Sequence, residues 1–298
     1  MKTTPDCVGC LVRQAMSTLA RTMPEGPERF LAIRNILLES TALDYDLPPP
    51  VLTGRLQAVL RGITKVDDPY LGEKRRYTQL ALKLLPKLEE EVAAAPNPFI
   101  AAVRLAIAGN VIDFGAKSSL TEGEVLAAVH AATNAPLHGE PDELEQLAAK
   151  ARSILYLADN AGESVLDTLL LSRLPKGLVT IAVRGRPILN DVTESDARDA
   201  SMDQFGTLVS NGSDVPGTHL QSCDPAFVRL FRRTDLIISK GQGNYETLLG
   251  EKAPIFFLFR VKCQIVADMT GHPLNGNLAL KSPCFTPLCR TAPDREDA

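Results

Sequence analysis

Short apolar runs alternate with helical stretches from residue 154 onward, and this alternation limits the folds that the chain can adopt. The runs are rich in large aliphatic residues, and each has the length of a single buried strand: 154–158, 178–183, 207–209, 236–239 and 255–259. Strands that are separated by helices pair in parallel through right-handed crossovers. The alternation therefore predicts a three-layer α/β sheet.

The chain before residue 150 has a different pattern and shows no convincing strand. Apolar residues recur there at three- and four-residue spacing, between proline-rich breaks, in four segments: 11–23, 28–43, 51–63 and 73–95. Three further helices should lead into the sheet: 99–115, 122–133 and 143–152. We predict an all-helical domain at residues 1–98 and an α/β domain at residues 99–298.

Composition excludes several classes of partner. The net charge of −4 gives no electrostatic reason to expect nucleic acid or an anionic membrane. No run approaches the roughly 20 apolar residues of a membrane span, and the N-terminus lacks the apolar region of a signal peptide. We therefore expect a cytoplasmic protein, with no nucleic-acid or membrane partner, that binds a small molecule.

The end of the first strand carries the strongest chemical signal. Asp159 and Asn160 follow it directly, and an amphipathic helix starts at about Glu163, so that free N–H groups should point over them. Carboxylate and amide oxygens suit a hard cation, whereas a helix start suits a phosphate. Asp191 follows the second strand and should project toward Asp159, although it also fits a turn or a helix cap. Together these residues predict a magnesium-type site that binds a phosphate.

Other loops offer candidate substrate contacts. The fourth strand ends in Lys240, Gly241, Gln242 and Gly243, which can present a cation and backbone N–H groups to an anion, or form an ordinary turn. Asn110 and Asp113 stand one turn apart on a mostly apolar helix, where they meet either a ligand or solvent at the helix end. Ser210 follows the third strand and either lines the site or belongs to a plain loop.

Several ordered motifs carry a family resemblance. Asp-Asn-Ala-Gly-Glu at 159–163, Asn-Asp-Val-Thr at 190–193 and Lys-Gly-Gln-Gly-Asn-Tyr-Glu at 240–246 resemble the damage-control phosphatases, or domain of unknown function 89. Four shorter motifs resemble the prokaryotic branch of that family: Cys7-Val8-Gly9-Cys10, Asp68-Pro69-Tyr70, Gly109–Asp113 and Lys262-Cys263. The resemblance spans nearly the whole chain. It implies a helical N-terminal domain on a Rossmann-like α/β domain.

The resemblance also implies an activity and a ligand set. A phosphatase of this kind uses Mg²⁺, Mn²⁺, Co²⁺ or Ni²⁺ to hydrolyse phosphate esters of small metabolites, such as sugar phosphates or damaged phosphometabolites. Its metal ligands would be Asp159, Asn160 and Asp191, with Lys240 and Asn244 near the phosphate. The assignment extends to further residues, among which an acidic one would be the general base: Asn110, Asp113, Glu163 and Ser210.

Two other functions fit parts of the sequence. An S-adenosylmethionine-dependent carboxyl methyltransferase would also use a Rossmann-like sheet, but the acid–amide pair matches a metal better than a methyl donor. A non-catalytic protein that binds phosphorylated metabolites would use the same pocket without turnover. A panel of phosphate esters, assayed with and without divalent metals, separates the three.

The cysteines give a second, separate signal. Cys7 and Cys10 form a CxxC pair, which is half of a structural zinc site. Cys263, Cys284 and Cys289 complete such a site only if the fold returns them to the N-terminus. A redox role is another function of a CxxC pair, but the thioredoxin-type βαβ context is missing. Packed thiols are the alternative to a metal or redox function, because free cysteines are among the most buried residues in proteins.

Overall fold

Three N-terminal helices form a layer with its own core in this computed structural model, which describes residues 1–109 and 122–287. They are α1 (Pro5–Thr22), α2 (Pro27–Thr41) and α3 (Pro49–Thr64), and each begins with a proline, which suits the first helical turn. Their periodic apolar side chains meet in one buried cluster: Leu11, Ala15, Leu19, Ala32, Ile36, Leu52, Leu56 and Leu60. The three helices predicted for this region are confirmed.

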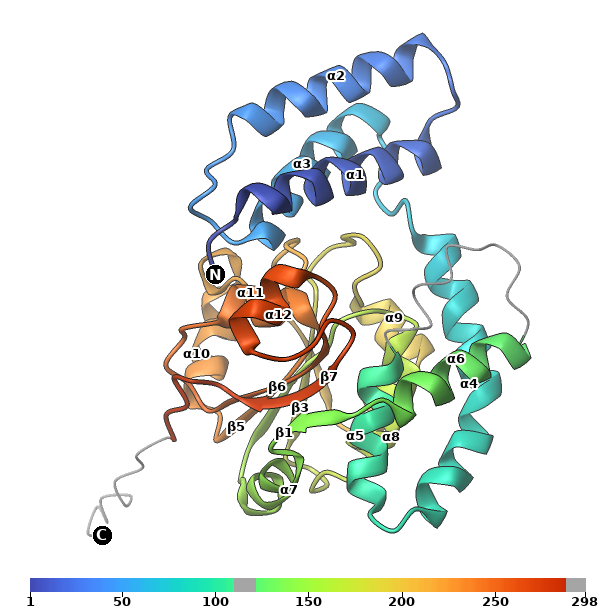
Figure 1. Cartoon of the computed structure of the whole chain (residues 1–298), viewed down its shortest axis with the longest axis vertical. Helices are drawn as coiled ribbons and strands as arrows, with labels where there is room; N and C mark the ends of the chain where they lie inside the picture. The colour runs from blue at the N-terminus through green and yellow to red at the C-terminus, as the bar shows by residue number, and fades with distance from the viewer. Residues whose placement is uncertain (110–121, 288–298) are drawn as a thin grey trace, which may run out of the picture.

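The other helices cover the two faces of a sheet (Figure 1). One face carries six helices of the described chain: α4 (Leu71–Ala94), α5 (Pro98–Ala108), α6 (Glu122–Asn134), α7 (Pro141–Lys150), α8 (Glu163–Leu171) and α9 (Glu194–Asp199). The other face carries α10 (Pro225–Arg233), α11 (Gln242–Leu248) and α12 (Gln264–Thr270). Two short 3₁₀ turns, Met202–Gln204 and Leu220–Ser222, join strands to helices.

The sheet has seven strands in the order β1-β7-β6-β5-β2-β3-β4 among the residues described. The strands are β1 (Leu137–Gly139), β2 (Ile154–Leu157), β3 (Val179–Val183), β4 (Thr207–Ser210), β5 (Leu236–Lys240), β6 (Ile255–Arg260) and β7 (Asn277–Lys281). From β4 to β6 all neighbours pair in parallel, as predicted, whereas β7 runs antiparallel to β6. The chain builds β3 and β4 on one side of β2 and then β5 and β6 on the other, so that the direction of winding switches between β2 and β5.

The alternation of side chains along a strand places the sheet between two cores. Ile154 and Tyr156 of β2 belong to the cluster beneath α4, α5 and α8, whereas Leu155 and Leu157 belong to the cluster beneath α10, α11 and α12. All four side chains are fully buried. The predicted three-layer α/β fold is therefore confirmed.

The strands β1 and β7 were not predicted from the sequence. The expectation that no strand precedes residue 150 was wrong, because β1 lies there. β1 has only three residues and pairs with β7 at the edge of the sheet, so that it carries too little periodicity to be detected. β7 has only three apolar residues, Leu278–Leu280, between Asn277 and Lys281, and no helix follows it in the part of the chain described. Its antiparallel pairing departs from the pattern of the other strands.

Packing suggests a shorter helical unit than residues 1–98. Tyr77, Ala81, Leu84 and Leu88 of α4 lie in the sheet-side core rather than in the core of the N-terminal layer. We therefore propose that the N-terminal unit ends with α3, near Thr64, and that α4 belongs to the α/β unit.

The N-terminal layer lies across the carboxyl ends of the strands (Figure 1). Arg61 of α3 donates to Asp214 Oδ2 at 3.0 Å and to the carbonyl oxygen of Pro187 at 3.1 Å, on loops that follow β4 and β3. The amino group of Met1 donates to the carbonyl oxygen of Glu246 at 2.6 Å, on α11. These contacts attach the layer to the sheet at two separate places.

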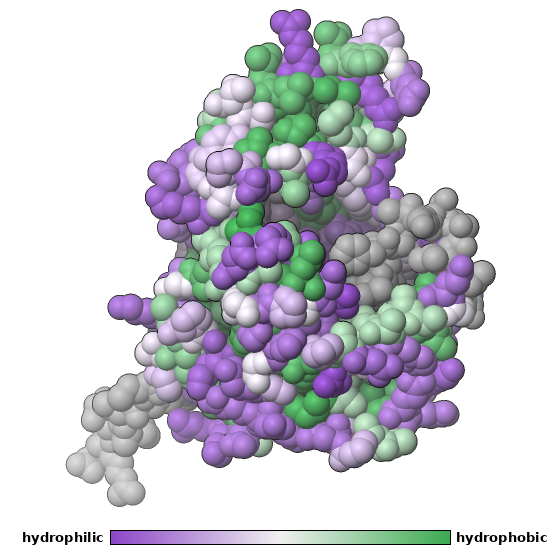
Figure 2. Space-filling view, viewed as in Figure 1, coloured by the Kyte–Doolittle hydropathy of each residue, from purple (hydrophilic) through white to green (hydrophobic). Residues whose placement is uncertain are grey.

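The outer surface of this layer is partly apolar. Figure 2 shows apolar side chains, in green, at the top of the molecule, where the exposed large hydrophobic residues of α1 and α2 lie: Met16, Phe30, Leu31, Leu37 and Leu38. Within the described residues, no helix combines the length and the apolar character needed to cross a membrane.

Candidate active site

The end of β2 places Asp159 and Asn160 together in a buried position. The strand stops at Leu157, and α8 starts at Glu163 after a tight turn. The side-chain amide of Asn160 donates to Asp159 Oδ2 at 2.9 Å and to Glu163 Oε2 at 3.1 Å. Because both amide hydrogens are directed at carboxylates, the carbonyl oxygen is the atom that Asn160 can offer to a cation.

The loop after β3 brings Asp191 to the same place. Asn160 and Asp191 form an isolated β-bridge, and Val192 donates from its backbone N–H to the carbonyl oxygen of Asp159 at 2.9 Å. Arg184 Nε donates to Asp191 Oδ2 at 2.7 Å, and both side chains are buried. Two strand ends therefore supply the three predicted metal ligands to one point. Thr193 and Asp196 form a capping box at the start of the next helix, α9.

Gly241 fits the end of β5 closely against this group. Its φ is +79°, in the region that favours glycine, and a Cβ at this position would overlap the Asp159 carboxylate. Gly243 follows on α11 and lines the adjoining cavity. The glycines that sequence reasoning assigned to substrate binding thus lie beside the predicted metal ligands. For Gly241, the close approach of backbone to carboxylate is the physical reason for a glycine.

Lys240 lies behind the site rather than facing the cavity. It is fully buried, and its ammonium group donates to a Glu163 carboxylate oxygen, to Asp167 Oδ1 at 2.6 Å and to the carbonyl oxygen of Ala106 at 2.8 Å. Burial alone lowers the pKa of Lys240, but the two carboxylates outweigh it and raise the pKa. The contact between Lys240 and phosphate stays a prediction. The ion pairs with Glu163 and Asp167 argue against it, because they already occupy the ammonium group. The structure instead connects Lys240 through Glu163 to Asn160.

Asn244 and Ser210, two other residues predicted to contact the substrate, form hydrogen bonds within the protein. Asn244 is fully buried and donates to the carbonyl oxygens of Lys240 at 2.7 Å and of Ala158 at 3.3 Å, so that it ties β5 to β2. Ser210 is exposed at the end of β4, where its hydroxyl accepts from the N–H of Gly212 at 3.0 Å. It is thus separate from the group around Asp159. Asn110 and Asp113 lie outside the described residues.

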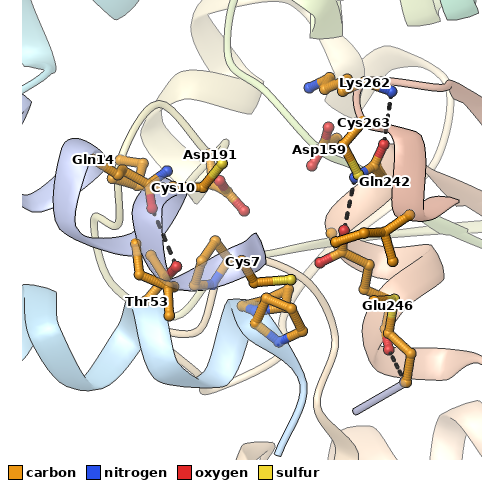
Figure 3. A pocket seen from close by; sticks show the side chains of 18 of the residues that line it. Cys7, Cys10, Gln14, Thr53, Asp159, Asp191, Gln242, Glu246, Lys262 and Cys263 are labelled. Carbon is orange, nitrogen blue, oxygen red and sulfur yellow. Dashed lines mark hydrogen bonds between the residues drawn. The ribbon is translucent and has the colours of Figure 1, made fainter. Parts of the chain in front are cut away.

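A cavity of about 500 Å³ opens between the N-terminal layer and this strand edge. Its lining includes the three predicted metal ligands, Asp159, Asn160 and Asp191. Figure 3 shows side chains from α1 and α3 facing others from α11 and from the loop after β6 across it: Cys7, Cys10, Gln14 and Thr53, and Gln242, Glu246, Lys262 and Cys263. The site therefore combines an acidic floor with a wall that the N-terminal layer supplies.

Lys262 is a cavity residue to which the strand-end argument assigned no role. It follows β6, and its side chain lines the cavity together with Asp159. The sequence could have indicated Lys262, because ligands of α/β sheets bind at the carboxyl ends of the strands. Asp159 and Asp191 were identified in this way, and Lys262 follows the fifth apolar run in the same manner. Among the described residues that line the cavity, Lys262 is the only lysine.

Buried negative charge dominates the electrostatics of the site. Burial, together with the carboxylates of Glu163 and Asp191, raises the pKa of Asp159 to about 7, against the opposing effects of Lys262 and Arg184. Burial also raises the pKa of Asp191, although Arg184 acts in the opposite direction. Because the charged form of these buried carboxyl groups is disfavoured, a cation bound beside them would stabilise it. The oxygen donors of the three residues are those that Mg²⁺ and similar ions prefer, so the site fits a divalent metal.

Fold and site together define a Rossmann-like α/β protein with an acidic cavity at its topological switch point, covered by a helical layer. The family described as damage-control phosphatase ARMT1-like domain matches residues 3–278. The chain belongs to this damage-control phosphatase family.

Individual relatives agree with the family assignment. The chain is 31% identical to an uncharacterized protein of Methanocaldococcus jannaschii, over 94% of this chain and 96% of that protein. It is 31% identical to a damage-control phosphatase of Archaeoglobus fulgidus, with 91% and 96% covered. A damage-control phosphatase of Pyrococcus horikoshii is 32% identical, with 72% and 75% covered.

A solved structure supports the same assignment. The crystal structure of a DUF89 family protein from Pyrococcus horikoshii superimposes with a TM-score of 0.88 at 27% sequence identity, and the match covers 95% of this chain and 99% of that one. The family and the fold predicted from the sequence are thus confirmed. The class of enzyme that they indicate is a phosphatase.

Proposed function

We propose that this chain is a divalent-metal-dependent phosphatase that hydrolyses phosphate monoesters of small metabolites, such as sugar phosphates or damaged phosphometabolites. The observation that carries the proposal is the convergence of two buried carboxylates and an amide oxygen at one cavity. Asp159, Asn160 and Asp191 would hold the metal, which is Mg²⁺, Mn²⁺, Co²⁺ or Ni²⁺. When bound, it supplies Lewis-acid stabilisation of the phosphoryl oxygens and lowers the pKa of water.

The residues of the chain have distinct tasks in this reaction. Lys262 binds an equatorial phosphate oxygen, because it is a cationic side chain on the cavity wall opposite the helical layer. Arg184 fixes the Asp191 carboxylate through its 2.7 Å hydrogen bond. Glu163, held by Lys240, fixes the amide of Asn160. The positions of these groups are set before the substrate binds, which reduces the cost of reorganisation during phosphoryl transfer.

The N-terminal layer contacts the leaving group. Gln14 and Thr53 line the cavity from α1 and α3, and the Thr53 hydroxyl donates to Gln14 Oε1 at 3.1 Å. Neutral polar groups of this kind can hydrogen-bond hydroxyls of a small metabolite. A cavity of about 500 Å³ is in the usual range for small-molecule sites.

A panel of phosphate esters tests the proposal. Metal-stripped protein should be inactive, and one or more of the four ions should restore release of inorganic phosphate. Asp159→Asn should abolish turnover and Mn²⁺ binding while the circular dichroism spectrum stays unchanged. Asp199→Asn is the matched control, because Asp199 is an exposed carboxylate on α9. Metal-independent turnover would refute the metal site, and binding of S-adenosylmethionine without phosphate release would favour a methyltransferase.

A further inference from the structure

Thiols gather in the wall of the cavity. Five cysteines lie in the described residues, and three of them line this one cavity: Cys7, Cys10 and Cys263. The fold thus returns Cys263 to the N-terminal CxxC pair. Cys284 lies outside the cavity lining, and Cys289 lies outside the described residues. Such clustering beside catalytic carboxylates points to a task for the thiols.

We propose that Cys7 and Cys10 are a thiol–disulfide modification site through which a small-molecule disulfide controls substrate binding. The two cysteines stand one helical turn apart on α1, so their side chains share a face. Cys10 is exposed and Cys7 is buried, with its Sγ 3.4 Å from the Thr4 hydroxyl. Cys263 instead accepts a hydrogen bond from Gln242 at 3.5 Å, which holds it on the opposite wall.

The exchange needs only a disulfide as co-reactant. The Cys10 thiolate attacks one sulfur of the small-molecule disulfide, so that one S–S bond breaks, a mixed disulfide forms and one small thiol leaves. Cys7, deprotonated, then attacks the Cys10 sulfur, which forms the Cys7–Cys10 bond and releases the second small thiol. The protein loses two protons and two electrons, and the small disulfide gains them as two thiols.

The disulfide must change the shape of the cavity wall. Side chains three residues apart on a helix have Cβ atoms about 5–6 Å apart, whereas a disulfide brings them to roughly 3.5–4.5 Å. Cys7 lies in the first turn of α1, where backbone N–H groups have no partner four residues earlier, so this turn can tighten with little loss of hydrogen bonds. Asp6, Leu11 and Gln14 of the same helix also line the cavity, and they move with it.

The catalytic carboxylates should stay in place, because they are anchored on the strand ends and not on α1. Oxidation should therefore raise KM by roughly tenfold, with a smaller change in kcat. This kinetic effect rests on the proposed phosphatase function, whereas the formation of the disulfide does not.

The test oxidises the full-length protein with a small-molecule disulfide such as oxidised glutathione. Intact mass should fall by two hydrogens, peptide mapping should give a Cys7–Cys10 link, and a dithiol should reverse both. Cys10→Ser should lose the response, each variant being compared with itself before and after oxidation. Cys223→Ser is the matched control, since Cys223 lies outside the cavity lining, and it should respond like the parent protein.

Three results would overturn the proposal: a link through Cys263, zinc retained by the pair in freshly purified protein, or a Cys7–Cys10 link that leaves KM unchanged. An absence of phosphatase activity in the fully reduced protein would instead count against the proposed function, whatever the mass measurement gives.

Discussion

Replacing Lys240 by methionine tests whether this lysine supports the site from behind. The substitution removes the ammonium group and leaves Glu163 and Asp167, which are 1% and 0% exposed, without their buried counter-ion. Removing one partner of a buried ion pair costs about 3–5 kcal/mol. Urea denaturation followed by circular dichroism should show this loss of unfolding free energy, whereas Lys150→Met, at an exposed position, should stay within about 0.5 kcal/mol of the parent protein.

The same variant has a pH signature. The pKa of Asp167 is raised to about 6 in the folded protein, chiefly by burial and in spite of Lys240. The folded state thus holds more protons than the unfolded state between pH ~4 and ~6, and stability falls as pH rises through this window. Without Lys240 the pKa rises further, so the deficit of Lys240→Met should be smaller at pH 5 than at pH 8.

Metal affinity provides the second measurement. Glu163 is no longer held by an ammonium group in Lys240→Met, and the orientation of the Asn160 amide relaxes with it. Loss of such an outer contact typically weakens a metal site about 10–100-fold. Adding Asp167→Leu should recover at least ~1 kcal/mol of stability, because one unpaired carboxylate is then gone. If Lys240→Met is as stable as the control and changes only KM for the phosphate ester, Lys240 contacts substrate and the reasoning is refuted.

Three further predictions concern the cavity and its surroundings. Gly241→Ala should abolish phosphate release and cost about 1–3 kcal/mol in urea denaturation, because its Cβ meets the Asp159 carboxylate; Gly250→Ala, with φ +95° and open space around it, isolates the backbone strain alone. Lys262→Met should raise KM about 10–100-fold in steady-state kinetics, the worth of a hydrogen bond to a charged group, and unchanged KM would remove Lys262 from the phosphate site. The pKa of Cys223 is raised to about 12 by burial, so iodoacetamide at pH 8 should label it far more slowly than in unfolded protein, as mass spectrometry can follow.

The sequence predicted the sheet well where its signal is strongest. The strands β2, β3, β5 and β6 are largely buried on both faces, so each reads as a short apolar run, whereas β4 lies at the edge of the sheet and none of its residues is fully buried. The residues after the strands identify the candidate functional edge. Asp159, Asn160 and Asp191 were placed together on this basis alone, and the structure brings them to one cavity. β1 and β7 lack such runs, and their pairing depends on contacts between residues about 140 positions apart.

Lys240 shows where strand-end reasoning was incomplete. Position along the chain tells that a residue is at the end of a strand, but the pleat decides the face to which its side chain points. Lys240 has the same parity as Leu236 and Ile238, both of which pack toward α5 and α8. Because side chains alternate between the two faces of a strand, the ammonium group of Lys240 points to the face that α5 and α8 cover. Lys262 follows its strand by two residues, beyond the pleat, and lines the cavity instead.

The separate core of the N-terminal layer has a consequence for how this enzyme can diversify. Residues such as Gln14 and Thr53 face the cavity from helices whose core is separate from the two cores of the sheet. Substitutions there can change which metabolite is accepted without disturbing the strand ends that hold Asp159 and Asp191. Under the proposed function, selectivity and chemistry would be encoded in different stretches of the chain, so that one could change while the other is kept.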